Sequence, residues 1–290
     1  MRRIHTIKGP PESFKQWLKA NEQEINKKLT GDDIWVYFHD NCVQGNINVY
    51  KELKKVLLKD QGFICCYCGK RIFDDHNTVI EHLIPKGSNK DLTLDFDNLL
   101  ASCNGGSSHQ IHIVENNETI LQIAQKYGVD VAHIEEVYVS IDEERLFRNK
   151  YDIENLSKND RIVIFPKMDS LDLHCDAKKG KSNITINPLQ DNCQDKFSYN
   201  PLNGKIICTD DNTSTIQTLG LNSNRYINQL RKKTLDDSII LKQNLMNDFG
   251  HSVEEFEENR LKLKMILDDI SYSNGYLDPF VFVTIWSLDN

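Results

Sequence analysis

The stretch CCYCGKRI, residues 65–72, decides the fold, because Cys65 and Cys68 have the spacing at which one turn presents two thiolates to a tetrahedral zinc ion. A third and a fourth cysteine stand in NLLASC, residues 98–103, and in HCDAKKG, residues 174–180. A closed four-sulfur site contributes on the order of 10 kcal/mol to folding. Free buried thiols or a redox pair are the alternatives. The predicted zinc ligands are Cys65, Cys68, Cys103 and Cys175.

The other cysteines lack ligand spacing. Cys66 is adjacent to a predicted ligand and is expected to be a bystander, whereas Cys42, Cys193 and Cys208 are expected to be small core residues. The chain has 290 residues and eight cysteines, and its N-terminal stretch MRRIHT leads into a proline pair without the apolar run of a secretory signal. Metal binding is therefore favoured over disulfides. We expect a cytoplasmic protein with no membrane-spanning segment.

The composition is that of an ordinary soluble globular protein, with 39% hydrophobic and 27% charged residues. The formal net charge of -8 argues against nucleic acid as a partner, since duplex binding draws most of its affinity from lysine and arginine. The acid is unevenly spread, because residues 109–168 hold eleven acidic and seven basic side chains, a difference of -4. Residues 1–60 are net basic. The protein can therefore carry a locally basic site.

Hydrophobic spacing and turn residues predict the elements around the cysteines. The first helix is interpreted as core packing rather than as an arm that binds a partner. Asn203-Gly204 is a strong hairpin signal between two short strands. The predicted helices are residues 13–29, 50–60, 224–247, 253–270 and 280–288. The predicted strands are residues 35–38, 78–84, 99–101, 197–199 and 205–207.

Residues 109–168 have a pattern of their own. The elements predicted there are strand 111–114, helix 119–126, helix 130–138 and strand 161–165, in the order βααβ. The stretch IHIVENNETILQIAQKYGVDVAHI resembles a LysM module, a family that recognises N-acetylglucosamine polymers. If the two strands pair antiparallel, the start of the first lies beside the end of the second. An insertion with adjacent ends leaves Cys103 and Cys175 free to meet.

The stretch IEHLIPK, residues 80–86, supplies groups suited to phosphodiester hydrolysis. That reaction needs an activated water, a cation for the charge that grows on the phosphate, and a base. A neutral imidazole with a pKa near ~6.5 can take the proton from water, so His82 is the candidate base. Glu81 points to the opposite face of a strand, so it reaches a metal only where the strand ends and bends.

Together these residues resemble the HNH endonuclease superfamily, whose ββα-metal unit joins two strands, a loop that holds an asparagine, and a helix that begins near a cysteine. The resemblance covers residues 65–103 and 174–180. It implies that Glu81 and Asp176 hold one Mg²⁺ or Mn²⁺ ion, a hard cation that favours oxygen ligands. It also implies that Asn98 hydrogen-bonds the loop that carries the base and fixes its orientation.

The sequence departs from the superfamily at both carboxylates. Aspartate is more usual where Glu81 stands, and histidine or asparagine is frequent where Asp176 stands. His174, just before a predicted zinc ligand, is a rival metal ligand. The assignment of the base is therefore more secure than that of the metal.

Three lysines follow the fourth cysteine. Lys178, Lys179 and Lys181 are expected at the start of a helix, where backbone N–H groups and cations can both meet phosphate. A solvated basic turn is the alternative reading of each. The lysines are the predicted nucleic-acid contacts.

Within the superfamily the chain is more similar to the HNH nuclease of retron-associated and Septu anti-phage systems. That resemblance covers most of the chain outside residues 109–168. It implies a partner ATPase of the ABC/SMC-like type and cleavage of DNA that is licensed by infection. The stretches that carry it are MRRI, Pro10-Pro11, Trp17, CCYCGKRI, IEHLIPK, NLLASCNGG, HCDAKKG and Asn187-Pro188-Leu189.

The expected fold class is α+β, a ββα-metal zinc-knuckle core interrupted by a βααβ LysM-like insertion and flanked by helical regions. The leading hypothesis is a metal-dependent HNH endonuclease in a defence complex. A non-enzymatic zinc-ribbon module and a LysM glycan-binding protein are the alternatives, and protein contact is the preferred role of the insertion. The expected segments are 1–60 (helical), 61–108 (nuclease, first part), 109–168 (insertion), 169–187 (nuclease, second part) and 188–290 (hairpin and helices).

Overall fold

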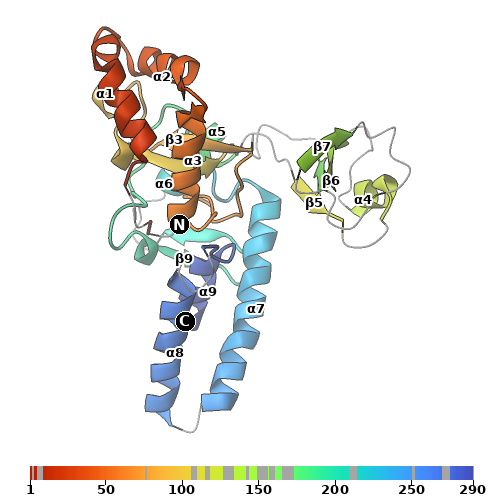
Figure 1. Cartoon of the computed structure of the whole chain (residues 1–290). Helices are drawn as coiled ribbons and strands as arrows, with labels where there is room; N and C mark the ends of the chain where they lie inside the picture. The colour runs from red at the N-terminus through yellow and green to blue at the C-terminus, as the bar shows by residue number, and fades with distance from the viewer. Residues whose placement is uncertain are drawn as a thin grey trace. The chain divides into compact units, whose positions relative to one another are not determined.

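The computed structural model has two compact units (Figure 1). The first consists of Met1–Gly105 together with His174–Asn290, and the second of Gly106–Leu173. All predicted zinc ligands therefore belong to the first unit, as do the helical regions from both ends of the sequence. The residues that the structure describes are 1, 3–4, 9–75, 77–105, 110–114, 118–126, 134–141, 144–148, 156, 161–164, 173–208, 214–249, 252–269 and 275–289.

Amphipathic helices open the first unit. α1 (Glu12–Asn26) and α3 (Val49–Asp60) confirm the two helices predicted there, and they pack against each other. The side chains of Phe14 and Trp17 are fully buried on one face of α1, as the hydrophobic spacing of this helix requires. The short strands β1 and β2, which pair before α3, are Val43–Gln44 and Ile47–Asn48.

The strand predicted at residues 35–38 is wrong, because these residues lie in the middle of helix α2 (Gly31–Asn41). A capping box starts this helix. The Thr30 hydroxyl accepts a hydrogen bond from the Asp33 N–H, and the Asp33 carboxylate accepts one from the Thr30 N–H, each at 3.1 Å. These bonds satisfy backbone groups that the first turn would otherwise leave unpaired, and they override the strand propensity of four bulky residues.

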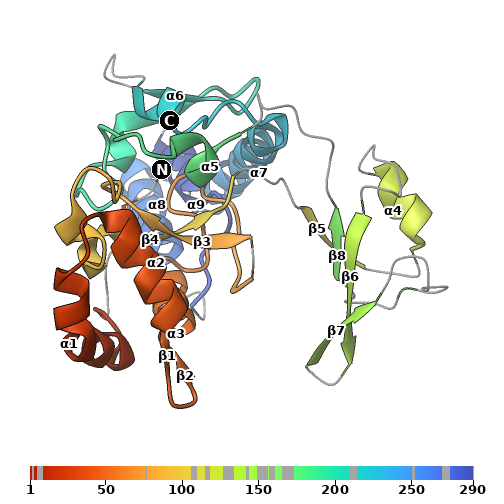
Figure 2. The ribbon, with the colours of Figure 1, turned by 90° about the horizontal axis from the view of Figure 1, so that it is seen from above.

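Two antiparallel strands and a short helix carry the cysteine and carboxylate segments. β3 (Thr78–His82) pairs with β4 (Leu99–Cys103) without a register shift, which confirms the strands predicted there. Every residue of β4 is buried, and α5 (Cys175–Lys179) packs against it (Figure 2). The buried Gln61 amide hydrogen-bonds both backbone groups of Ala101 at 2.7 Å, in the manner of a neighbouring strand. This small antiparallel sheet is the centre of an α+β fold.

The two halves of the first unit join at Gly105 and His174. The Gly105 carbonyl accepts a hydrogen bond of 3.0 Å from the His174 N–H, and the Asn104 carbonyl accepts one of 3.1 Å from the Ala177 N–H. Gly105 has a φ of +58°, and a Cβ built on it would lie 1.5 Å from the His174 carbonyl oxygen. The chain therefore leaves the first unit and returns to it at one place, as the topological argument predicted.

We expect Gly105→Ala to destabilise the first unit strongly. A side chain is strained at this positive φ, and the new methyl group would overlap backbone atoms of His174, which cannot move aside as a flexible side chain can. The expected loss is about 3 kcal/mol or more in the free energy of unfolding, measured by urea denaturation. Gly87→Ala is the matched control, because a Cβ there would meet nothing within 4 Å. Equal stability of the two variants would contradict the close packing of Gly105 against the His174 backbone.

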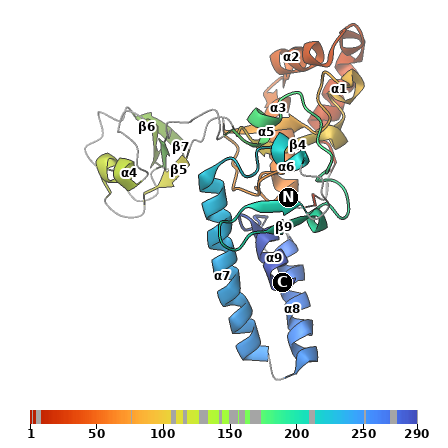
Figure 3. The same ribbon diagram turned by 180° about the vertical axis from the view of Figure 1, so that it is seen from behind.

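The C-terminal part of the first unit matches the predicted hairpin and helices. β9 (Phe197–Tyr199) pairs antiparallel with β10 (Ile206–Cys208) around the Asn-Gly turn. Three helices that contact one another follow (Figure 3). None of the described helices combines the length and the apolar character that crossing a membrane needs. After α6 (Ser214–Thr218), these helices are α7 (Arg225–Phe249), α8 (Val253–Asp268) and α9 (Val281–Asp289).

The start of α9 packs directly on the cysteine loop. The Phe280 N–H donates a hydrogen bond of 3.0 Å to the Gly69 carbonyl, and the Leu277 N–H donates one of 3.0 Å to the Gly62 carbonyl. The Phe282 ring fills the space beside Gly69, where a Cβ would lie 2.1 Å from a ring carbon. Residues 61–105 and 188–290, which the sequence analysis assigns to separate segments, are therefore parts of one packed unit.

The second unit contains a four-stranded antiparallel sheet in the order β5-β8-β6-β7. Its first and last strands pair, so that Gln110 faces Ile164, as predicted for an insertion with adjacent ends. Ile123 and Ala124 are the buried residues of its described helix. The elements in chain order are β5 (Gln110–Ile113), α4 (Ile120–Lys126), β6 (Ile134–Ile141), β7 (Glu144–Arg148) and β8 (Arg161–Ile164).

The predicted βααβ order of this unit is wrong. Of the helix predicted at residues 130–138, residues 130–133 lie outside the described part, and residues 134–138 belong to β6. The stretch VYVSI alternates β-branched and other side chains, which favours a strand, and β6 forms a hairpin with β7 that the sequence analysis missed. The described residues of this unit form one helix and four strands, in place of the predicted βααβ order.

Candidate metal centre and adjoining pocket

Four buried cysteines form the predicted metal site. The sulfur atoms of Cys65, Cys68, Cys103 and Cys175 all lie within 4.8 Å of one another. Two of the separations are 3.8 Å, between Cys65 and Cys175, and 3.9 Å, between Cys68 and Cys103. A tetrahedral zinc ion with bonds of about 2.3 Å separates its sulfur ligands by about 3.8 Å. The group could therefore hold a structural metal ion such as zinc.

Three segments of the first unit converge on this centre. Cys65 and Cys68 lie in the loop after α3, Cys103 ends β4, and Cys175 begins α5. The Cys103 N–H points at the Cys65 sulfur at 3.3 Å, an arrangement that stabilises a thiolate ligand. The Cys175 N–H donates a hydrogen bond of 2.8 Å to the Leu219 carbonyl, which anchors the fourth ligand to the segment after α6. A metal ion here would cross-link distant parts of the sequence.

The remaining cysteines are not members of this four-sulfur group. None of the eight cysteines forms a disulfide. Cys66 is buried next to two of the ligands but is not a member of the four-sulfur group, and neither is the rival ligand His174. Cys42 and Cys193 are buried and Cys208 is half-buried. The four cysteines predicted as ligands are therefore the four that the structure brings together.

A pocket of about 370 Å³ lies at the ends of β3 and α5. Glu81 and His82 are the last two residues of β3, so both side chains can reach the pocket although residues alternate between the faces of a strand. Asp176 reaches it from the first turn of α5. The lining residues are Asp32, Ile80, Glu81, His82, Pro85, Lys86, Gly87, Asp176, Ala177, Lys179, Gly180 and Lys181.

The imidazole of His82 is held in one orientation. Its Nε2 lies 2.9 Å from the Thr93 carbonyl oxygen, and its ring stands edge-on to the Trp35 ring, with centroids 4.5 Å apart. A carbonyl only accepts, so Nε2 carries the proton and Nδ1 has the free lone pair. Burial and the nearby charge of Lys86 lower the pKa of His82 to about 4. The imidazole is therefore neutral at pH 7, and Nδ1 is the ring nitrogen without a proton.

The two carboxyl groups converge as the resemblance implied. Glu81 is buried, and its Oε1 accepts a hydrogen bond of 3.1 Å from the Tyr67 hydroxyl. Asp176 hydrogen-bonds Glu81, and burial, this bond and the charge of Glu81 together raise the pKa of Asp176 to about 8. At neutral pH Asp176 therefore keeps its proton. A divalent cation bound by these carboxyl groups would have to displace that proton.

Asn98 hydrogen-bonds the loop that follows His82, as predicted. Its Oδ1 accepts from the Ile84 N–H at 2.7 Å, and its Nδ2 donates to the carbonyls of Ile84 and Leu92 at 3.0 and 2.9 Å. Asn98 is buried, so its amide positions this loop rather than contacting a ligand. The loop between β3 and β4 also contains the short 3₁₀ helices Lys90–Leu92 and Phe96–Asn98.

The predicted lysines differ from one another in the structure. α5 begins at Cys175, so Lys178 and Lys179 lie in its last turn and not at its start. Lys178 is exposed, whereas Lys179 is buried and its Nζ lies 2.7 Å from Glu81 Oε1. Lys179 is therefore not available as a nucleic-acid contact. Lys181 is exposed and lines the pocket.

The sequence analysis missed several residues that shape the pocket. Lys86 lies 5.4 Å above the Trp35 ring and 3.8 Å from Asp32, which also pairs with Lys181 at 3.6 Å. Asp32 and Trp35 belong to α2, which the sequence analysis missed. The capping box at Thr30 is the sequence signal that would have predicted this helix. The position of Lys86 beside Trp35 and Asp32 depends on tertiary packing, so the spacing of residues in the sequence could not predict it.

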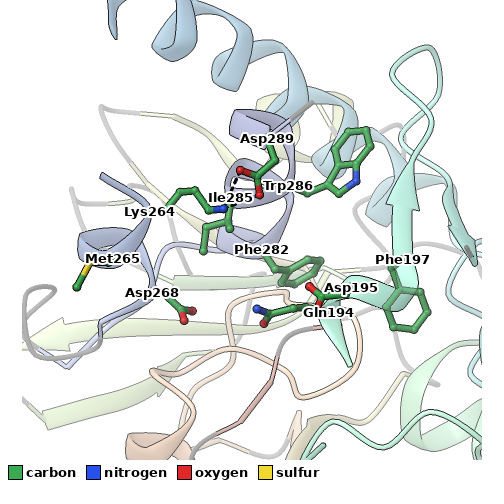
Figure 4. A pocket seen from close by; sticks show the side chains of 10 residues that line it. All are labelled: Gln194, Asp195, Phe197, Lys264, Met265, Asp268, Phe282, Ile285, Trp286 and Asp289. Atoms are coloured by element: carbon green, nitrogen blue, oxygen red, sulfur yellow. Dashed lines mark hydrogen bonds and ion pairs between the residues drawn. The ribbon is translucent and has the colours of Figure 1, made fainter. Parts of the chain in front are cut away.

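A larger pocket of about 460 Å³ lies between the C-terminal helices and the start of β9. Phe282 and Trp286 supply aromatic surface, and Lys264 pairs with Asp289 at 2.5 Å (Figure 4). None of the predicted site residues lines it. Its lining residues are Gln194, Asp195, Phe197, Lys264, Met265, Asp268, Phe282, Ile285, Trp286 and Asp289.

Comparisons with known proteins place the chain in no family. No protein-family model matches the sequence, and no curated protein matches it. The functional argument therefore depends on the geometry of the four-cysteine centre and of the pocket beside it.

Proposed function

We propose that this chain is a metal-dependent endonuclease of the HNH type, which hydrolyses phosphodiester bonds of DNA. The observation that carries the proposal is the convergence of Glu81, His82 and Asp176 on one pocket beside the four-cysteine centre. A zinc-ribbon module that only binds its target has no need for this convergence. The order of two antiparallel strands and a short helix around the site also supports it.

In this proposal Glu81 and Asp176 hold a divalent cation such as Mg²⁺ or Mn²⁺. When bound, such an ion stabilises the charge that grows on the phosphate and on the departing oxygen. His82 takes the proton of the attacking water at Nδ1, because its Nε2 proton is fixed on the Thr93 carbonyl. Zinc at the four cysteines holds β4 and α5 together, and so keeps both carboxyl groups in place.

Lysines at the rim of the pocket are the proposed phosphate contacts. Lys181 has an 86% exposed side chain, and both it and Lys86 line the pocket. Asp32 lies near both ammonium groups and keeps them at the rim until a phosphate competes for them. The pocket lining has three lysines and three carboxyl groups, so these cations offset its acidic groups on a chain with a net charge of -8.

The proposed setting is an anti-phage defence complex. It is supported by the resemblance of the sequence to the nuclease of retron-associated and Septu systems. The partner would be an ABC/SMC-like ATPase, and the second unit is a candidate surface for protein contact. Co-purification of the chain with the proteins encoded beside it tests this part of the proposal.

Cleavage of a supercoiled plasmid tests the catalytic proposal. We expect nicked and linear products with Mg²⁺ or Mn²⁺, and their loss in Asp176→Asn by at least about a hundredfold, since one of two proposed cation ligands is removed. Asp97→Asn, which changes an exposed carboxylate of the same unit, is the matched control and should cleave normally. The assay is run on the chain alone and on the co-purified complex. Equal cleavage by both variants, or none by the wild type in either form, would refute the proposal.

The second candidate is a zinc module that binds nucleic acid without cleaving it. The ion pair between Lys179 and Glu81 favours this function, because it already neutralises one of the carboxylates. Binding of DNA in a gel-shift assay, without cleavage by the chain or the complex under any divalent cation, would establish this alternative.

A further inference from the structure

Lys179 is a buried lysine that has no part in the proposed reaction. Lys179 is 2% exposed, although its neighbours Lys178 and Gly180 are exposed. Its Nζ lies 2.7 Å from Glu81 Oε1 and donates a hydrogen bond of 2.7 Å to the His82 carbonyl. Removing an ammonium group from water is costly unless it is paired and hydrogen-bonded, as it is here. The fold therefore fixes a positive charge at the end of β3.

These contacts assign different tasks to the two oxygens of Glu81. Oε1 accepts hydrogen bonds from both Lys179 and Tyr67. Oε2 is therefore the oxygen left for Asp176 or for a cation. A carboxylate can bind a cation through one oxygen while the other remains hydrogen-bonded, so Lys179 leaves room for a cation. It places an ammonium group beside that cation.

We propose that Lys179 is a positioning residue and an internal counter-ion of the cation site, and that its charge sets how tightly Glu81 and Asp176 bind a divalent cation. This inference rests on the proposed function, which places the cation at these two carboxyl groups. The ammonium group offsets one carboxylate charge, so the site attracts a cation less strongly than a bare pair of carboxylates. When a divalent cation is bound, the two carboxylates, the ammonium group and the cation together carry a net positive charge. This charge favours binding of a phosphate group.

Titration of the full-length, zinc-loaded chain with Mn²⁺ tests this role without any assay of activity. Lys179→Met keeps the apolar stem and removes the charge, so we expect Mn²⁺ to bind at least about tenfold tighter. Lys179→Arg keeps the charge and should bind like the wild type. Lys178→Met, the same change at the exposed neighbour, is the matched control and should also bind like the wild type. Calorimetry and the electron paramagnetic resonance signal of free Mn²⁺ give the affinity.

A second pair of variants covers the case in which Lys179→Met does not fold. Removing one partner of a buried ion pair destabilises a protein, whereas removing both charges leaves no unpaired charge behind. We therefore compare Glu81→Gln with the double variant Glu81→Gln/Lys179→Met, and expect the double variant to bind Mn²⁺ more tightly. Zinc content and circular dichroism establish the fold of each variant. If loss of Lys179 tightens binding in neither background, the counter-ion role is refuted.

The same titration separates this inference from the proposed function. A wild-type chain that binds Mn²⁺ through Glu81 and Asp176, but cleaves DNA neither alone nor in the co-purified complex, would refute the nuclease and leave the role of Lys179 intact. A chain that cleaves DNA, and whose Lys179→Met variant binds Mn²⁺ no tighter, would refute the role of Lys179 alone. A wild-type chain that binds no Mn²⁺ would refute both.

Discussion

Replacing Cys103 with serine should remove zinc from the chain and lower the midpoint of thermal unfolding by about 10 °C or more. Cys103 ends β4, and its sulfur lies with three others in a group that spans three segments of the first unit. A structural zinc site contributes on the order of 10 kcal/mol, so loss of one of four ligands is expected to cost several kcal/mol. Each kcal/mol corresponds to about 2–4 °C in a chain of this size. Mass spectrometry of bound metal and a thermal melt give the two readouts.

Cys66→Ser is the control for this experiment. Cys66 is buried and adjacent to Cys65 but lies outside the four-sulfur group. We expect this variant to keep one zinc ion per chain and to lose only the small stability that a buried hydroxyl costs. If Cys66→Ser lost zinc as readily as Cys103→Ser, the assignment of ligands from geometry would be wrong. If the wild type held no zinc, the centre would be a cluster of buried thiols.

The four-cysteine group could be predicted because its evidence is local. A Cys-x-x-Cys turn fixes two ligands by covalent spacing, and β3 and β4 have strand patterns that place Cys103 at a strand end. Prediction of the fourth ligand, Cys175, also required that the chain leave the first unit and return to it at one place. The contact of Gly105 with His174 marks that place. Covalent spacing and strand pairing together were therefore sufficient.

The errors arose where local propensity and tertiary context disagree. Trp35 lies in a helix because the capping box at Thr30 and the burial of Ile34 and Phe38, four residues apart, outweigh the strand propensity of bulky residues. In the second unit, the sequence predicted a helix over residues 130–138, whereas residues 134–138 belong to β6, which pairs with two strands. Strand pairing is non-local, so a single sequence gives little signal for it.

Lys179 shows why charge alone does not reveal a nucleic-acid contact. In sequence it belongs to a lysine cluster, and nothing in its spacing separates it from Lys178. The helix turns Lys179 inward, towards Glu81, and leaves Lys178 in solvent. The partner of Lys179 lies on a strand that is far away in sequence, so only the folded chain assigns the two lysines to different tasks.

His82→Gln should abolish cleavage while leaving the fold and the metal centre intact. Nε2 of His82 bonds to the Thr93 carbonyl, and the amide NH₂ of glutamine can donate a similar bond. Glutamine cannot accept a proton from water at neutral pH, so the variant removes the base and keeps the positioning contact. General-base catalysis contributes about 10²–10⁴-fold, which is the loss of cleavage rate that we expect. Initial rates on a supercoiled plasmid, with saturating Mn²⁺, give the comparison.

Glutamine is more informative at this position than alanine. His82→Ala would leave the Thr93 carbonyl unpaired and a cavity against the Trp35 ring, at a cost of about 2–4 kcal/mol in stability, so lost activity could reflect lost structure. His39→Ala, an exposed histidine on α2, serves as the control and should cleave like the wild type. Unchanged zinc content and unfolding midpoint in His82→Gln would assign its loss of rate to chemistry. Removal of a general base lowers the rate by at least about a hundredfold. A folded His82→Gln variant that kept more than about a tenth of the wild-type rate would therefore show that another group accepts the proton.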